Sequence, residues 1–264
     1  MESIQRLREI CQRGKEHDPG WYVAHRRLSI YLTRPMLRAG AGPMAASLGM
    51  VACGLAGAGL IAMSNGWANV AGFALLYLSF LFDKVDGEIA RYRGVSSTLG
   101  ILVDRYHHRL VEPLLFVASA VHAYRLGGTW WSVVLGLTTV VLANVIEEHQ
   151  QLPAVVLLKY VRDTGRLPET GEAGAARTRG ALHMAFRVLK GFRLFIVALP
   201  ALALAYAIAS VTGLPAIEVY LAASTAALGA YLVYQVVMLW SGGMDNEIAR
   251  ARQALVGGGR HDRP

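Results

Sequence analysis

The sequence predicts an all-α integral membrane protein with six transmembrane helices. Of its 264 residues, 54% are hydrophobic and only 17% are charged. The apolar residues form long blocks, and a helix of about 20 residues is enough to cross the hydrocarbon core of a bilayer. These blocks predict spans at about residues 44–64, 66–82, 110–123, 129–146, 194–217 and 219–240, the third belonging to a helix that is polar in its first half.

The N-terminal segment precedes the first span and has a different pattern. Residues 4–13 and 26–38 mix apolar and basic side chains at helical spacing, which predicts amphipathic helices along the membrane interface. For the first of them, a solvated helix that caps the bundle fits equally well. Pro43 then opens the first span, at a position that needs no amide proton. The predicted divisions are an interfacial segment (1–42), a transmembrane domain (43–240) and a cytoplasmic tail (241–264).

The spans differ in what they carry. Small residues let helix backbones approach closely in lipid, and the first span holds four glycines that we expect to serve packing: Gly49, Gly54, Gly57 and Gly59. The second span runs without a charge into an acidic motif. A polar connection follows the fourth span at residues 147–190, and its glycines and proline predict a loop with a short interfacial helix.

Basic residues set the predicted orientation. The formal net charge is +8, and Lys and Arg gather in the N-terminal segment, the connection after the fourth span and the tail, whereas the opposite turns hold only Arg125. By the positive-inside tendency, both termini and the end of the second span face the cytoplasm, in the cell (inner) membrane. Because the basic residues are spread over membrane-flanking segments, we expect membrane lipids as partners and no nucleic acid. Cys11 and Cys53 are too few for a disulfide framework.

Acidic residues at the end of the second span predict a metal site. Asp83 and Asp86 are three residues apart, and Asp104 and His108 are four apart, so each pair lies on one face if both segments are helical. Carboxylates clustered at membrane depth repel one another unless cations lie between them. Hard oxygen ligands favour Mg²⁺ or Mn²⁺, which neutralise phosphate oxygens during phosphoryl transfer. The pattern therefore predicts a phosphate-bearing substrate.

The residues between these acids support the same chemistry. Gly87 and Ala90 follow Asp83 by four and seven residues, which leaves bare backbone on the acidic face where a bulky group can lie close. Arg91, one turn beyond Gly87, offers a planar set of donors to a phosphate.

Together these residues resemble the signature of the CDP-alcohol phosphotransferase family of integral membrane enzymes. That signature reads Asp-x2-Asp-Gly-x2-Ala-Arg, seven or eight residues, then Gly-x3-Asp-x3-Asp. Seven of its eight defined positions match here: Asp83, Asp86, Gly87, Ala90, Arg91, Gly100 and Asp104. The eighth position holds His108, where the family has aspartate.

The resemblance implies a reaction and a set of roles. A CDP-linked lipid or alcohol, such as CDP-diacylglycerol, would donate its phosphoalcohol group to an acceptor hydroxyl, with or without a phosphate of its own, and release CMP in phospholipid biosynthesis. A homodimer is also expected from the family. The roles that carry over are metal binding by Asp83, Asp86 and Asp104, substrate binding by Gly87, Ala90 and Gly100, and support of the phosphates by Arg91.

His108 stands where the family carries the carboxylate that activates the acceptor hydroxyl. An imidazole accepts a proton near neutral pH, so we expect His108 to be an active general base and a metal ligand. Loss of one hard oxygen ligand weakens a second Mg²⁺ and favours Mn²⁺ or a single ion. The alternative is a catalytically impaired homologue that still binds a CDP-alcohol. His107, three residues after Asp104, is a second candidate for the role of base.

The start of the first span departs from the family pattern. Relatives often have Pro-Asn-x2-Thr, and this chain has Pro43-Met-Ala-Ala-Ser47. Ser47 either keeps part of a nucleotide contact or hydrogen-bonds to its own helix.

Two other functions use similar residues. An intramembrane prenyltransferase binds a metal-pyrophosphate at aspartate-rich helix ends, but such enzymes usually need two such motifs and more spans. A transporter binds cations at midplane carboxylates, but this chain has no duplicated half or paired broken helices.

Overall fold

The computed structural model describes residues 2–13, 20–167, 186, 188–189, 191–240, 248–249 and 252. All regular secondary structure in these residues is helical, which confirms the predicted fold class. Within the described residues, five helices are long and apolar enough to cross a membrane: α3 (Pro43–Ile61), α4 (Gly66–Arg93), α7 (Trp130–Thr164), α9 (Phe195–Thr212) and α10 (Ala216–Met238). The chain forms two compact units: Met1–Gly136 with Leu199–Glu218, and Leu137–Ala198 with Val219–Pro264. The predicted tail lies almost entirely outside the described residues.

The N-terminal segment forms α1 (Ile4–Cys11) and α2 (Gly20–Arg38). Leu7 and Cys11 of α1 are fully buried and form a cluster with Ile30 of α2. Since apolar side chains at helical spacing meet the neighbouring helix, the apolar face of α1 is covered by protein. This arrangement fits the capping alternative for the first amphipathic helix.

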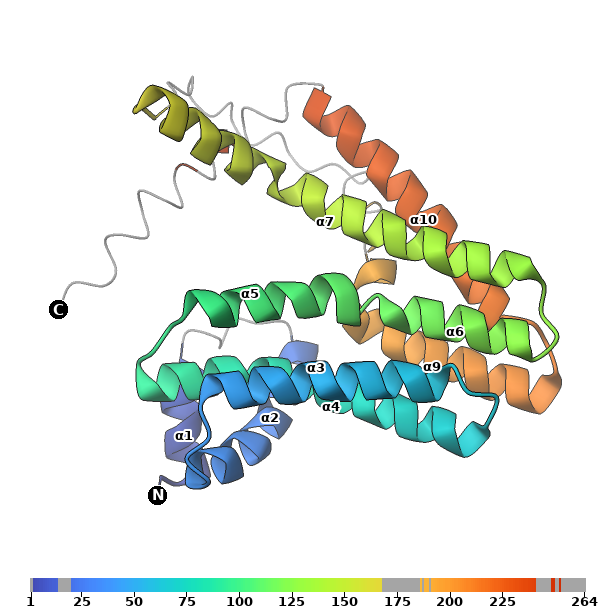
Figure 1. Ribbon diagram of the computed structural model, residues 1–264, viewed down its shortest axis with the longest axis horizontal. Coiled ribbons are helices and arrows are strands. Elements are labelled where there is room, and N and C mark those ends of the chain that lie inside the picture. The colour runs from blue at the N-terminus through green and yellow to red at the C-terminus, as the bar shows by residue number, and fades with distance from the viewer. Residues whose placement is uncertain are drawn as a thin grey trace. The chain divides into compact units, whose positions relative to one another are not determined.

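A buried carboxylate fastens these helices to α4. Glu88 has no exposed surface, and it accepts hydrogen bonds from Gln12 Nε2 (2.8 Å), Ser29 Oγ (2.6 Å) and Thr33 Oγ1 (2.5 Å). Figure 1 shows α1 and α2 beside the C-terminal end of α4. Because a buried carboxylate is stable only when it is hydrogen-bonded, α4 depends on the N-terminal segment at this end.

Helices α3 and α4 lie side by side along most of their length (Figure 1). A Cβ added to Gly57 would meet the Gly72 carbonyl oxygen at 2.8 Å, and one added to Gly72 would meet the Gly57 oxygen at 2.8 Å. A Cβ at Gly54 would lie 2.1 Å from a neighbouring side-chain carbon. The packing role is thus confirmed for Gly54 and Gly57. At Gly49 a Cβ would make ordinary contact at 3.4 Å, and at Gly59 it would meet no described atom within 4 Å, so a packing role for Gly59 stays a prediction.

Both ends of α4 are defined by local chemistry. Asn65 begins the helix, and its side-chain oxygen accepts hydrogen bonds from two amides of the first turn (2.9 and 3.2 Å). Gly94 follows the last helical residue with φ of 62°, a left-handed conformation that favours glycine. Arg93 Nη2 donates to the carbonyls of Gly40 and Ala41, each at 2.7 Å. The end of α4 that carries the acidic motif is therefore fixed to the chain that precedes α3.

The third predicted span is interrupted. It comes as three short helices, none of them long enough alone to cross a bilayer: α5 (Thr98–Tyr106), the π-helical turn η1 (His107–Val111) and α6 (Leu114–Arg125). Five spanning helices are thus found in the described residues where the sequence predicts six. Pro113 accounts for the break, because it has no amide proton and its ring clashes with the carbonyl four residues earlier. The amide of Glu112 instead reaches the carbonyl of His107 at 3.1 Å, five residues back.

The second unit contains most of α7 and α10. One buried cluster of this unit is formed by Ala143, Ile146, Leu228 and Tyr231. Helix α7 continues through Pro153 to Thr164, so the first part of the connection predicted at residues 147–190 is helical rather than a loop. Residues 168–185 of that connection lie outside the described residues.

Replacing Glu88 by alanine would remove the charged acceptor that two buried hydroxyls and the partly buried Gln12 amide share, and would leave each of them only a backbone carbonyl. A hydrogen bond to a charged group contributes about 1.5–3 kcal/mol. We expect E88A to lower the thermal unfolding temperature of the detergent-purified protein and to make the N-terminal segment sensitive to protease. E9A is the matched control, because Glu9 forms an exposed pair with Arg6 and such pairs contribute at most about 1 kcal/mol. Wild-type stability and protease resistance in E88A would contradict the proposed anchor.

Burial, together with the nearby Glu88 carboxylate, raises the pKa of the Cys11 thiol to about 11. Only the thiolate is strongly nucleophilic, so in a C53S variant Cys11 should react slowly with a maleimide at pH 7 and faster as the pH rises towards 11. The same variant unfolded in detergent should react as an ordinary cysteine, and adding E88A should speed the reaction at pH 7. Rapid labelling of the native C53S protein at pH 7 would show that α1 is not packed in this way.

Candidate active site

Asp83 and Asp86 project from the C-terminal part of α4. The Asp83 side chain is only 8% exposed and contacts the ammonium group of Lys84, which lies 4.7 Å from the centre of the Phe80 ring. Asp86 Oδ2 accepts a hydrogen bond from Ser47 Oγ of α3 at 3.1 Å. Each carboxylate of the first acidic pair therefore has a partner, from its own helix or from α3.

Ser47 serves two acceptors. Its hydroxyl lies 3.3 Å from the carbonyl of Pro43, in its own helix, and 3.1 Å from Asp86. The predicted bond to its own helix is present, and the second contact places Ser47 beside the acidic motif. A nucleotide contact by Ser47 stays a prediction.

Helix α5 and the turn η1 bring Asp104 and His108 to Asp83. His108 Nε2 lies 3.6 Å from Asp83 Oδ1 and 3.5 Å from Asp104 Oδ1. Each of these three residues offers one ligand atom, and all of these atoms lie within 4.8 Å of one another. Among the described residues, Asp86 is not a member of this group. The structure thus brings together three of the four residues that we predicted to bind metal.

The donor set of this group fits a divalent cation. Two carboxylate oxygens suit hard ions such as Mg²⁺, and an imidazole nitrogen shifts the preference towards Mn²⁺ and other transition metals. The side chains of Asp104 and His108 are 43% and 42% exposed, against 8% for Asp83. An ion or a substrate can therefore approach from the side of α5, while Asp83 lies on the buried side of the site.

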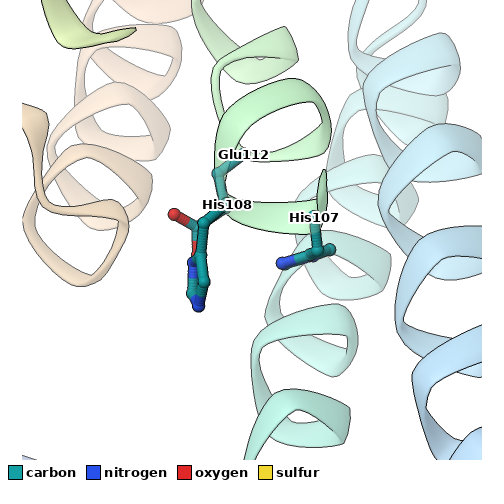
Figure 2. A group of neighbouring side chains, drawn as sticks. All are labelled: His107, His108 and Glu112. Atoms are coloured by element: carbon teal, nitrogen blue, oxygen red, sulfur yellow. The ribbon is translucent and has the colours of Figure 1, made fainter. Parts of the chain in front are cut away.

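Glu112 is a member of the site that the motif does not predict. Its Oε1 lies 2.9 Å from His108 Nδ1, and its side chain is 18% exposed. Figure 2 shows the His108 ring and the Glu112 carboxylate lying together, with the His107 ring to one side. One ligand atom of each of these three residues lies within 4.8 Å of the others. The spacing of four residues was the available signal, but local spacing also allows Glu112 to pair with Arg109 at three residues. Only the structure identifies His108 as a partner.

His107 points into the protein and is 1% exposed. Its Nε2 lies 2.9 Å from Ser79 Oγ, and that hydroxyl donates its single hydrogen to the carbonyl of Met50 at 2.7 Å. His107 must therefore donate through Nε2–H to the serine oxygen. The contact fixes η1 to α3 and α4, and it makes His107 a less suitable base than the exposed His108.

Arg91 lies over the bare backbone of Gly87. A Cβ added to Gly87 would lie 3.2 Å from Arg91 Nη1, so the absence of a side chain makes room for the guanidinium. The Nε of the same arginine donates to the carbonyl of Cys11, the last residue of α1. The N-terminal segment thus holds the arginine that the sequence assigns to the phosphates.

The two remaining predicted residues are small. Ala90 is half-buried on α4, four residues after Asp86. Gly100 lies in the first turn of α5, where its amide donates to Ser97 Oγ at 2.9 Å and a Cβ would lie 3.0 Å from that oxygen. Gly100 therefore supports the start of α5, and substrate binding by Ala90 and Gly100 stays a prediction.

Comparison with known proteins identifies one family. The family model described as CDP-alcohol phosphatidyltransferase matches residues 28–168, which is more than half of the chain and includes every residue of the candidate site. No curated protein matches the chain.

Proposed function

The chain belongs to the CDP-alcohol phosphatidyltransferase family, and we propose that it transfers a phosphatidyl or other phosphoalcohol group from a CDP-alcohol to an acceptor hydroxyl, releasing CMP. CDP-diacylglycerol is the donor that we favour, in phospholipid biosynthesis. The observation that carries the proposal is the convergence of Asp83, Asp104 and His108 from α4, α5 and η1 within 4.8 Å, inside the matched region.

Asp83 and Asp104 would hold the divalent cation, Mg²⁺ or Mn²⁺, and His108 would add Nε2 as a third ligand in the substrate-free protein. Because Nε2 has a single lone pair, it must be free of the ion to accept a proton. When bound, such an ion neutralises charge on the pyrophosphate oxygens of the donor. Asp86 would complete the acidic face, and its bond from Ser47 fixes the direction of its carboxylate. Because the carboxylates of Asp83, Asp86 and Asp104 repel an anionic donor, the proposal requires the ion for binding as well as for chemistry.

Gly87, Ala90 and Arg91 would receive the nucleotide and its phosphates. The bare backbone at Gly87 allows close approach of a flat base, and the guanidinium above it offers a planar set of donors to phosphate oxygens. Arg91 is oriented by the carbonyl of Cys11, so part of its conformational freedom is already lost before the donor binds. Gly100 and Ser47 would act at the edges of this pocket, through the start of α5 and through Asp86.

His108 would act as the general base. The hydroxyl of the acceptor gives its proton to His108 Nε2, its oxygen forms the new bond to the phosphorus distal to cytidine, and the bond from that phosphorus to the CMP oxygen breaks. CMP leaves with that electron pair, and the proton on His108 then passes to solvent, to which the side chain is 42% exposed.

The cellular setting follows from charge and hydrophobicity. We propose that the active site and both termini face the cytoplasm at the inner membrane, since basic residues flank the spans on that side. Membrane lipids are then both surroundings and substrates, and a homodimer is the assembly that we expect.

A direct test measures CMP release by the purified protein in lipid micelles with CDP-diacylglycerol and a panel of alcohols, each with or without phosphate. H108N keeps a polar side chain but cannot accept the proton, and we expect it to lose about 10²–10⁴-fold in rate. H108D restores the signature of the family and should remain active. Wild-type rates in H108N would remove His108 as the base, and CDP-alcohol binding without any CMP release would identify an impaired homologue.

A second test addresses the cation. D83N and D104N each remove a charged ligand, so we expect weaker Mn²⁺ binding to the substrate-free protein, measured by the loss of the free Mn²⁺ electron paramagnetic resonance signal. E9A is the matched control, since Glu9 lies in an exposed pair on α1. Unchanged Mn²⁺ affinity in both site variants would contradict the assignment of the ligands, whatever the activity.

A further inference from the structure

The contact between His108 and Glu112 determines which ring nitrogen of His108 is free. His108 Nδ1 lies 2.9 Å from Glu112 Oε1, and an ionised carboxylate only accepts hydrogen bonds. The hydrogen is therefore on Nδ1. In the neutral ring the lone pair is then on Nε2, the atom that lies 3.6 Å from Asp83 Oδ1 and 3.5 Å from Asp104 Oδ1.

Without such a partner the ring would have no fixed direction. The His108 side chain is 42% exposed. Rotation about its Cβ–Cγ bond exchanges the positions of the ring nitrogens with those of the ring carbons at little cost. Glu112 is less exposed, at 18%, and it directly precedes the rigid Pro113. Its backbone amide is also fixed, because it donates to the carbonyl of His107 across the π-helical turn. The carboxylate therefore approaches the ring from a constrained position.

We propose that Glu112 is the positioning residue for His108 in this enzyme. It holds the imidazole through Nδ1–H, so that Nε2 faces the site (Figure 2). The inference rests on the proposed function, in which the acceptor hydroxyl gives its proton to His108. Glu112 itself touches neither the substrate nor the reacting atoms.

The assignment explains how a histidine can occupy a position where the family signature has aspartate. A carboxylate at position 108 needs no orienting partner, because both of its oxygens are acceptors. An imidazole does need one, since only one of its nitrogens can face the site with a lone pair. Glu112 supplies that partner one helical turn later, on the same face of the helix.

The experiment compares Glu112 variants in two backgrounds, by CMP release and by Mn²⁺ affinity of the substrate-free protein. In the His108 background, E112A should lower both by about 10–100-fold, as loss of such an outer partner typically does. E112Q should recover part of the loss, because its side-chain oxygen still accepts from Nδ1–H. In the H108D background, E112A should change CMP release and Mn²⁺ affinity by less than about twofold, since the imidazole that Glu112 contacts is already absent.

The controls separate this inference from the proposed function. E9A reports the effect of removing a carboxylate far from the site, and thermal unfolding of each variant reports folding. If the wild type releases no CMP but E112A still weakens Mn²⁺ binding only in the His108 background, the proposed function fails and the positioning role stands. Equal losses on E112A in both backgrounds, or none in the His108 background, would overturn the positioning role.

Discussion

Carboxylates that lie in an apolar helix end must each meet a donor or a cation, because an unpaired buried charge costs several kcal/mol. At the motif end of α4 this requirement applies to Asp83, Asp86 and Glu88, and each is met by a different part of the chain. Asp83 contacts Lys84 and lies near His108, Asp86 accepts from Ser47 of α3, and Glu88 accepts from the N-terminal segment. One stretch of α4 thereby fixes the helices around it, and the same bonds set the directions of the carboxylates that face the site.

The N-terminal helices α1 and α2 take part in these contacts with α4, in addition to their predicted place at the membrane interface. The last carbonyls of a helix have no partner within it, and the carbonyl of Cys11 at the end of α1 is satisfied by Arg91. Glu88 lies one helical turn before Arg91 on α4 and holds α1 and α2 in place. The arginine proposed to bind phosphate is therefore oriented by a segment whose own position depends on a buried carboxylate. Binding of the donor and packing of the N-terminal segment are coupled through these contacts.

Sequence spacing was sufficient for features that depend on one helix or on an apolar block. It predicted the all-α class, the helix that carries Asp83 and Asp86, and the pairing of Asp104 with His108 on one face. It did not predict partners chosen by tertiary packing, such as the donors to Glu88 that lie 55 to 76 residues away in the chain. The extension of α7 past Pro153 was also missed, because polar residues followed by a proline read locally as a loop, whereas the helix continues to Thr164 with most of its side chains exposed. The sequence spacing did not predict the π-helical turn before Pro113 either.

The residue at position 108 and the residue at position 112 are best understood as one unit. The family signature has four aspartates; this chain keeps three of them, and Glu112 lies as a fourth carboxylate beside the histidine. The difference is the imidazole ring of His108. Its Nδ1 hydrogen points towards Glu112, and its Nε2 lies near Asp83 and Asp104. Were position 108 an aspartate, it would face Glu112 at four residues with like charge, which destabilises a helix. The glutamate is thus compatible with histidine at position 108 and unfavourable beside aspartate, which is the physical reason to assign it to the chemistry of His108 rather than to the packing of α6.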